Sequence, residues 1–241
     1  MTSAGPAVSV IIPTYNEREN LPALVRRVSD ALRATPAAEA EILIVDDDSP
    51  DGTATLAEQL SSTAPVPVRC IVRRGERGLA TAVIRGLREA RGRVCVVMDA
   101  DLSHPPESIP ALLAALDDSG VQMAVGSRFV RGGRVDLHWP LHRRLNSLFG
   151  RMLARPLTPV KDMMAGFFAV RRADVQLDRL APVGYKILLE ILVRHGFRRV
   201  MEVPITFADR AAGRTKLDVA EQLRYLRHLS KLYAFVLRGR R

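Results

Sequence analysis

The sequence has few of the residues that build several common kinds of binding site. Aromatic residues make up 5% of its 241 residues and no zinc-ligand spacing occurs, so a nucleic-acid-binding platform is not expected. The two cysteines, Cys70 and Cys95, lie in apolar, strand-like runs, which argues against a disulfide framework or a CxxC metal site. We predict that both are buried, reduced thiols.

Long apolar stretches are also missing. No window reaches the roughly 18 uninterrupted apolar residues that indicate a transmembrane helix. The N-terminal MTSAGPAVSV lacks a basic start followed by a long apolar region, so no signal peptide is predicted. We therefore expect a cytoplasmic protein, or one bound peripherally to the cytoplasmic face of a membrane.

Several enzyme motifs are absent as well, among them Walker GxxxxGK, GxGxxG, GxSxG and HExxH. The formal net charge is +10, which favours an anionic partner such as a phosphorylated ligand or an anionic membrane. From Arg210 to the end, nine Lys or Arg residues stand against two acidic ones. A second basic cluster lies mid-chain and comprises Arg131, Arg134, Arg143, Arg144, Arg151 and Arg155.

The N-terminal half alternates short apolar runs with helical patterns. Strands are predicted at 8–12, 41–45, 68–72, around Cys95 and at 121–125. Helices are predicted after an N-cap at Asn20, from Thr53, over 79–90 and from Pro106. Short runs that are apolar on both faces and separated by helices are typical of a parallel sheet covered on both sides.

After Arg128 this alternation breaks. The later predicted elements are helices over 141–154, 184–194 and from Lys216, and strands at 166–170 and 200–207, where Pro204 favours a sheet edge. No linker marks a second domain. The fold class predicted is therefore a single Rossmann-like α/β domain with a mostly parallel central sheet and helices on both faces.

Polar clusters follow three of the predicted strands: PTYNE (13–17), DDDSPDGT (46–53) and DADLSH (99–104). Ligands of open parallel sheets bind beyond the carboxyl ends of the strands. Each cluster alone is also compatible with an ordinary turn or a helix cap. Their occurrence at equivalent ends of one sheet favours a shared ligand site.

The DADLSH cluster carries two acids, Asp99 and Asp101, at alternate positions of an extended segment, so both side chains point to the same side. Two neighbouring carboxylates repel each other unless a cation lies beside them. Mg²⁺ or Mn²⁺ suits this role, because such a cation takes one or two carboxylates together with phosphate oxygens and water.

Two enzyme classes fit this pattern. Haloacid-dehalogenase-type phosphotransferases also place DxDx[TV] after an apolar strand and use the first Asp, here Asp99, as the nucleophile. That motif normally lies on the first strand of its domain, whereas here it follows the fourth, and no later GDxxxD pair occurs. The second class is a metal-assisted transferase that uses a nucleotide-diphosphate donor.

Eight segments together resemble the dolichol-phosphate mannose synthases, which are inverting family-2 glycosyltransferases with a GT-A fold. They are VSVIIPTYNERENL, ILIVDDDSPDGT, GLATAVIRGLREARG, VVMDADLSHPPE, VGSRFVRGG, AGFFAVRR, GYKILLEIL and FADRAAGRTKL, which span residues 8–217 in the family order. The first three are shared across family 2. DADLSHPP and the closing DRxxGxxK pattern are more specific to the branch with polyprenyl-phosphate acceptors.

The resemblance implies transfer of mannose from GDP-mannose to dolichyl or polyprenyl phosphate, assisted by Mg²⁺ or Mn²⁺. Another hexose from a UDP-sugar is the alternative donor group. The implied nucleoside contacts are Pro13, Tyr15, Glu17, Val45 and Asp47, and those to the ribose or sugar are Asp99 and Ala100. Asp101 would bind the metal. The implied phosphate contacts are Arg128, Arg210 and Lys216, with Arg143 or Arg144 at the acceptor phosphate.

Two positions depart from the family pattern. Some relatives carry Gln, a second metal contact, where Ser103 stands, so water would complete the metal shell here. Many carry SGF where this chain has Ala165 followed by Gly166 and Phe167, so any role of a serine hydroxyl is lost. We interpret His104 as a turn or capping residue, and Met163, Met164, Phe167 and Phe168 as core.

We predict a catalytic domain over 1–215 and a basic amphipathic helix over 216–241. Val219, Leu223, Leu226, Ser230, Tyr233 and Leu237 recur at helical spacing, and Arg224, Arg227, Lys231 and Arg238 occupy another face. The helix either docks on the domain or lies on an anionic membrane. A membrane-embedded partner subunit is an equally good route to a lipid acceptor.

Overall fold

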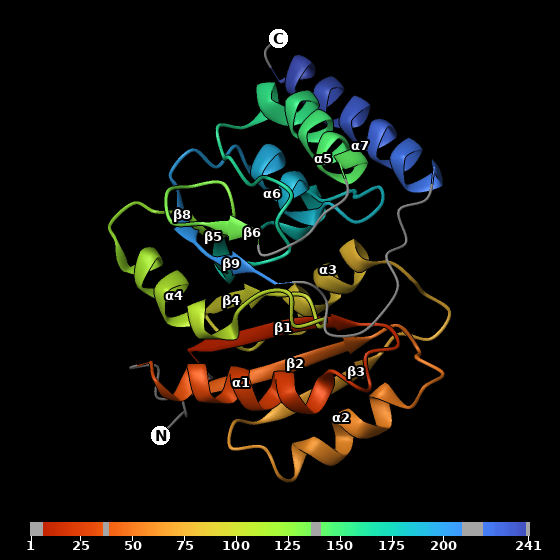
Figure 1. The fold of residues 1–241 in the computed structure, drawn as a ribbon, viewed down its shortest axis with the longest axis vertical. Helices are drawn as coiled ribbons and strands as arrows, with labels where there is room; N and C mark the ends of the chain where they lie inside the picture. The colour runs from red at the N-terminus through yellow and green to blue at the C-terminus, as the bar shows by residue number, and fades with distance from the viewer. Residues whose placement is uncertain (1–6, 36–38, 136–140, 209–218, 240–241) are drawn as a thin grey trace.

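The computed structural model describes residues 7–35, 39–135, 141–208 and 219–239, and it confirms a mainly parallel α/β fold (Figure 1). A seven-stranded sheet has the order β3-β2-β1-β4-β7-β5-β8. Its strands are β1 Val8–Thr14, β2 Ala40–Asp46, β3 Val68–Val72, β4 Val94–Val97, β5 Met123–Ser127, β7 Phe168–Arg171 and β8 Val200–Pro204. Only β7 runs antiparallel to its neighbours, β4 and β5, within this described sheet.

The helices form layers on both faces of the sheet. They are α1 Leu21–Arg33, α2 Thr53–Ser61, α3 Leu79–Glu89, α4 Ile109–Asp117, α5 Leu141–Ala154, α6 Ile187–His195 and α7 Val219–Arg238. Short 3-10 turns lie at η1 Pro106–Ser108, η2 Arg155–Leu157, η3 Arg172–Asp174 and η4 Leu177–Arg179. The apolar residues of α1, α2 and α4 share one core, and those of α3, α6 and α7 share the other.

The central strand β1 supplies side chains to both cores. Val10 and Ile12 face the α1 side, and Ile11 faces the α3 side, as the period of two in a strand requires. On α3, a Cβ added at Gly86 would lie 2.3 Å from Ile11 Cγ2. Glycine at this position therefore lets α3 pack close to the sheet.

Some predicted elements differ from the observed ones. The strands predicted to start at 121 and 166 start two residues later, because turns precede them: Val121 N–H donates to Asp118 O, and Ala165 N–H donates to Asp162 O. The strand predicted over 200–207 is two strands. β8 ends at Pro204 on the sheet edge, as predicted, and β9 Thr206–Phe207 pairs in parallel with β6 Arg134–Val135.

Three smaller predictions have a clear outcome. Asn20 occupies the N-cap position of α1, but its side chain accepts no hydrogen bond from the backbone of the helix; its Nδ2 instead donates to Glu17 Oε2 at 2.8 Å. Cys95 is buried as predicted, whereas Cys70 is only half-buried, and neither is joined in a disulfide in the structure. Burial is the main cause that raises the pKa of each thiol to about 12.

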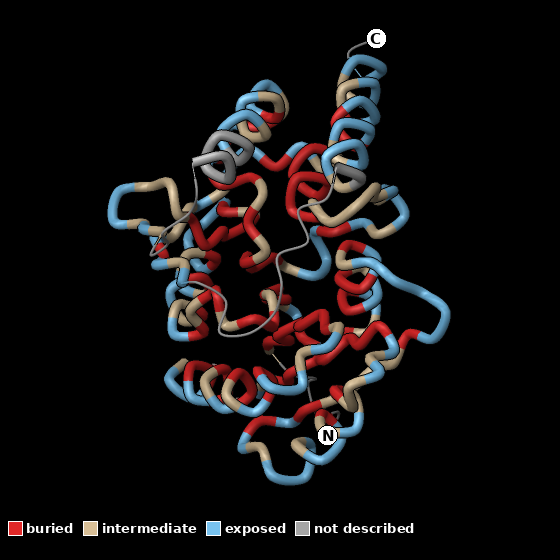
Figure 2. The backbone as a smooth tube through the Cα atoms, turned by 45° about the vertical axis from the view of Figure 1, so that its right-hand side comes forward, coloured by how far each residue is buried: buried red, intermediate tan, exposed pale blue. Residues whose placement is uncertain are grey.

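The helices α5 and α7 lie side by side at one end of the molecule (Figure 1). Leu229 and Leu232 anchor α7 in the core. Along the rest of its length α7 is largely exposed, in contrast to the sheet, where buried residues concentrate (Figure 2). None of the described helices combines the length and the apolar character needed to cross a membrane.

Candidate active site

The three polar clusters follow β1, β2 and β4, which are adjacent parallel strands, so they lie at one edge of the sheet. Each cluster contains one non-glycine residue with positive φ: Asn16 at 60°, Asp48 at 54° and Leu102 at 61°. No other non-glycine residue in the described ranges has positive φ. Such backbone is costly for residues with a Cβ and concentrates at ligand sites. Unusual backbone geometry therefore gathers at the edge predicted to bind ligand.

In the DDDSPDGT cluster, the first acid holds the loop together. The fully buried Asp46 accepts hydrogen bonds through Oδ1 from Thr14 Oγ1 at 2.8 Å and from Ser49 Oγ at 2.6 Å. Its Oδ2 accepts the Ser49 N–H at 2.8 Å. Since Thr14 ends β1 and Ser49 lies in the loop after β2, the Asp46 side chain joins the two clusters.

The next acid, Asp47, makes a buried ion pair. Its Oδ1 lies 2.7 Å from Arg73 Nε, and its Oδ2 accepts the Gly78 N–H at 2.7 Å. Arg77, in the same segment, places its guanidinium 4.5 Å from the centroid of the Tyr15 ring. The segment over 73–78 therefore fixes Asp47 and flanks Tyr15. Sequence reasoning missed Arg73, although an arginine directly after a buried strand was an available signal.

The other predicted nucleoside contacts come from the same strand ends. Pro13 of β1 and Val45 of β2 are register partners in the sheet. Glu17 donates its N–H to Thr53 Oγ1 at 3.0 Å, at the start of α2. The structure therefore brings together the five residues predicted to hold the nucleoside: Pro13, Tyr15, Glu17, Val45 and Asp47.

In the DADLSH cluster, Asp101 is buried and Asp99 is partly exposed. Asp101 Oδ1 accepts the Ser103 N–H at 3.1 Å and also the Ser103 hydroxyl. Asp99 Oδ2 lies 3.6 Å from His104 Nδ1. Ala100, between the acids, packs into the core beneath α1 and α4. Ser103 thus supports Asp101.

His104 lies in a bend of the loop before η1, consistent with the predicted turn position, and its buried side chain also packs against aromatic rings. Its ring lies 5.5 Å from the Phe167 ring and 5.1 Å from the Phe207 ring, between centroids. Burial lowers the pKa of His104 against the opposing effect of the Asp99 and Asp101 charges. The imidazole is therefore neutral at pH 7 and forms part of the wall beside Asp99.

The AGFF segment makes room for Asp99. A Cβ added at Gly166 would lie 2.6 Å from Asp99 Oδ2 and 2.8 Å from Oδ1. Any side chain there would displace the carboxylate. The predicted core role of the neighbouring residues is confirmed, because Met163, Phe167 and Phe168 are buried and Met164 packs against the core.

Arg128, at the end of β5, is held by Asp162 through three hydrogen bonds. Arg128 Nε and Nη2 each lie 2.8 Å from an Asp162 carboxylate oxygen, and the Arg128 N–H donates to Oδ2 at 3.0 Å. Glu202 of β8 in turn accepts the N–H groups of Lys161 and Asp162. Sequence reasoning missed Asp162, which precedes the AGFF segment and forms part of no motif considered.

The structure gives less information on the remaining predicted site residues. Arg210 and Lys216 fall outside the described residues. Arg143 and Arg144 belong to the first turns of α5, where side chains are not described. The Ala208 N–H donates to Ser103 O at 3.1 Å, so Ala208 lies beside the DADLSH loop.

The carboxylate side chains at this edge suit a hard divalent cation that is coordinated jointly by the protein and by a bound ligand. In the described residues no group of three or more His, Cys, Asp or Glu side chains could hold a metal by itself. Mg²⁺ and Mn²⁺ do not need such a cage, since one carboxylate with phosphate oxygens and water is sufficient. Asp101, fixed by Ser103, meets that requirement.

The fold is of the GT-A type. The chain matches the model of glycosyl transferase family 2 over residues 9–177 and therefore belongs to that family. This confirms the family, the fold class and the enzyme class predicted from sequence. The family differs from the haloacid-dehalogenase-type phosphotransferases considered as the alternative.

Two curated relatives are named dolichol-phosphate mannosyltransferase. The protein from Pyrococcus furiosus is 49% identical over 229 residues, with 93% of this chain and 63% of the relative covered. The protein from Mycosarcoma maydis is 44% identical over 241 residues, with 97% of this chain and 81% of the relative covered. The chain thus spans just under two thirds of the Pyrococcus relative.

Solved structures share the fold. A mannosyltransferase from Pyrobaculum calidifontis in complex with GDP-Man and Mn²⁺ has a TM-score of 0.63 at 20% identity, covering 98% of this chain and 65% of its own. Glucosyl-3-phosphoglycerate synthase from Mycobacterium tuberculosis has a TM-score of 0.67 at 22% identity, covering 96% of this chain and 81% of its own.

Proposed function

We propose that the protein transfers mannose from GDP-mannose to a dolichyl or polyprenyl phosphate, with inversion at the anomeric carbon. The observation that carries the proposal is the 44% identity to a dolichol-phosphate mannosyltransferase over 97% of the chain. The arrangement of the described site supports it, because the residues predicted to contact the nucleoside and the ribose or sugar lie at the ends of the adjacent strands β1, β2 and β4.

In the proposed reaction the acceptor phosphate is the nucleophile. One of its oxygens forms a bond to the anomeric carbon, while the bond from that carbon to the donor diphosphate breaks and GDP leaves with the electron pair. A lipid monophosphate is already ionised at neutral pH, so little or no general base is needed. The requirement is instead to bring two anions together and to stabilise the departing charge, which preorganised electrostatics does well.

Each part of the site has a role in this proposal. Pro13, Tyr15, Glu17, Val45 and Asp47 hold the nucleoside, and Asp99 and Ala100 orient the ribose or sugar. Asp101 would hold Mg²⁺ or Mn²⁺, which would supply positive charge to the donor diphosphate. Arg128, Arg210 and Lys216 add positive charge at the phosphates, with Arg143 or Arg144 on the acceptor.

We further propose that residues 1–215 form the catalytic domain and that α7, within 216–241, contacts an anionic membrane. Apolar side chains are exposed on both neighbouring helices: Leu148, Phe149 and Met152 on α5, and Leu223, Leu226 and Leu237 on α7. Exposed basic residues accompany them on α7, namely Arg224, Arg227, Lys231 and Arg238. Apolar anchors flanked by basic residues suit an anionic bilayer surface. A membrane-embedded partner subunit is the other route to the lipid.

The decisive experiment offers the protein a panel of nucleotide sugars and a short polyprenyl phosphate, with and without Mg²⁺ or Mn²⁺. We expect transfer from GDP-mannose, and a loss of roughly 10²–10³ in rate in Asp101→Ala. Asp117→Ala, at the exposed end of α4, is the control and keeps wild-type activity. Transfer from UDP-sugars alone contradicts the donor, and full activity of Asp101→Ala contradicts the metal site.

Membrane contact is tested separately by flotation with vesicles that contain anionic lipid. We expect the wild type to float, and a variant with Phe149→Ser and Leu223→Ser to remain largely at the bottom. Neutral vesicles are the control for the basic residues. Equal recovery of wild type with and without vesicles would contradict the proposed surface.

A further inference from the structure

Arg151 belongs to the mid-chain basic cluster, and the proposed reaction gives it no role. It lies in the last turn of α5, and its guanidinium carbon Cζ lies 3.7 Å from the centroid of the Phe129 ring. Phe129 directly follows Arg128 in the bend after β5, and Arg128 Cζ lies 5.3 Å from the same ring centroid. One aromatic ring therefore has both guanidinium groups within the range of a cation–π contact.

Two hydrogen bonds from α7 fix the turn of α5 that carries Arg151. The Tyr225 hydroxyl donates to Gly150 O at 2.7 Å. The Tyr233 hydroxyl donates to Leu153 O, also at 2.7 Å. The two carbonyl groups flank Arg151 in the sequence, so a rotation of α5 about its axis would break both bonds. The fold therefore holds the backbone of Arg151 in place.

The two guanidinium groups differ in their polar partners. Arg128 is bound bidentate by Asp162. Arg151 forms no hydrogen bond or ion pair with any group in the described part of the chain, and its Nε is buried without a partner. Arg128, Arg151 and Asp162 together carry one net positive charge, and Arg151 is the source of the excess. A buried donor without a partner is costly, and a phosphate oxygen is a strong acceptor for it.

Exposed apolar side chains of α5 lie next to this cation. Leu148 is 46% exposed and Met152 is 64% exposed. Leu148 lies about one helical turn before both Arg151 and Met152, so the three residues are neighbours on the helix surface. A ligand that joins a phosphate to an apolar chain can therefore place the phosphate at Arg151 and the chain on the other two side chains.

We propose that Arg151 and Arg128 together bind the phosphate of the lipid acceptor, a proposal that rests on the function proposed above. Leu148 and Met152 then contact the first part of the apolar chain. The sheet order favours the acceptor over the donor, because β4 and β7 separate β5 from β1 and β2, whose ends carry the residues predicted for the nucleoside. A nucleotide sugar also has no apolar chain to place on α5.

Steady-state kinetics with Arg151→Met and Arg151→Lys tests the charged part of the proposal. Methionine keeps an unbranched apolar side chain and removes the charge, whereas lysine keeps the charge. We expect Arg151→Met to raise the KM for a short polyprenyl phosphate roughly 10- to 100-fold, as for a lost charge-assisted hydrogen bond, and to change the KM for GDP-mannose less than about twofold. Arg151→Lys should recover part of the loss, because lysine lacks the planar fork of donors.

The matched control for the lost charge is Arg33→Met, at the exposed end of α1, which should keep wild-type kinetics. Equal rises in both KM values of Arg151→Met, without recovery in Arg151→Lys, would indicate lost structure and would overturn the role of Arg151. A rise in the KM for GDP-mannose alone would overturn the assignment to the acceptor.

Calorimetric titration tests the apolar part with two probes, dodecyl phosphate below its micellar concentration and butyl phosphate. Wild type should bind dodecyl phosphate more tightly, and a variant with Leu148→Gln and Met152→Gln should lose most of that difference. Equal affinity of wild type for the two probes would overturn the apolar contact.

The same titration separates this proposal from the function on which it rests, because it requires no turnover. If wild type fails to use polyprenyl phosphate, the proposed function is wrong, and the dodecyl phosphate affinity of Arg151→Met still decides whether this residue binds a phosphate. An affinity equal to that of wild type would overturn the proposal, and a loss of roughly 10- to 100-fold would support it.

Discussion

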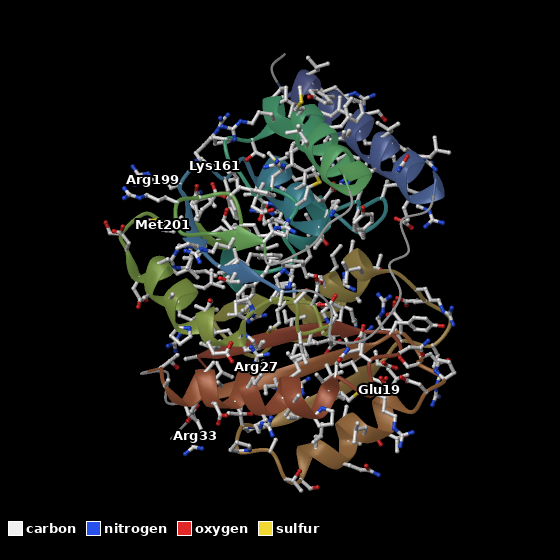
Figure 3. The ribbon with its side chains drawn as sticks, viewed as in Figure 1. Glu19, Arg27, Arg33, Lys161, Arg199 and Met201 are labelled. Carbon is white, nitrogen blue, oxygen red and sulfur yellow. The ribbon has the colours of Figure 1, made fainter. Side chains whose placement is uncertain are left out.

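Two arginine–carboxylate pairs in this protein have the same geometry and differ in burial. Arg128 and Asp162 are joined by two bonds of 2.8 Å, with side chains 13% and 0% exposed. Arg27 of α1, labelled in Figure 3, and Glu107 of η1 are joined by bonds of 2.7 and 2.8 Å, with side chains 35% and 59% exposed. The comparison therefore isolates the effect of burial.

The predicted perturbation is removal of the arginine from each pair. Arg128→Met leaves the Asp162 carboxylate buried with only one described hydrogen bond, from the backbone of residue 128, and should cost about 3–5 kcal/mol of unfolding free energy. Arg27→Met leaves Glu107 in contact with water and should cost about 0–1 kcal/mol. A double variant, Arg128→Met with Asp162→Leu, should recover a large part of the loss, because no unpaired charge remains.

Urea unfolding at neutral pH, followed by circular dichroism, measures all of these free energies. Raised salt provides an internal control, since it should weaken the exposed pair and leave the buried pair nearly unchanged. Equal costs for Arg128→Met and Arg27→Met would refute the reasoning. So would a double variant less stable than Arg128→Met, because the cost would then come from lost packing and not from the stranded carboxylate.

Three further predictions follow from the described contacts. Gly166→Ala should reduce transferase activity roughly 10²-fold by displacing Asp99, with GDP binding largely retained; kinetics at wild-type rate would contradict the close approach. Arg73→Met should weaken GDP binding in calorimetry, because Asp47 loses its ion-pair partner, and unchanged affinity would refute this. Burial favours a raised pKa for Glu190, but hydrogen bonds from His228 and Ala181 and the Arg194 charge lower it below 4.5. The Glu190 carboxylate therefore contributes its full stabilisation of the folded state above about pH 4.5, and this contribution is lost as the pH falls through the lower pKa that the group has in the folded protein. Glu190→Gln should therefore make the free energy of unfolding fall less steeply at acid pH.

The sequence by itself determined the elements and the edge of the sheet that binds ligand. Strand and helix periods are local properties, which is why 8–12, 41–45 and 79–90 are recovered within two residues. The three polar clusters at strand ends were equally visible, because parallel strands joined by helices place their carboxyl ends at one edge. Motif spacing then indicated family 2.

Only the tertiary structure decided which polar groups contact each other. Antiparallel β7 inserts between β4 and β5 and brings Asp162 to Arg128 and Gly166 to Asp99. No local pattern encodes these contacts, because they depend on the packing of segments far apart in the chain.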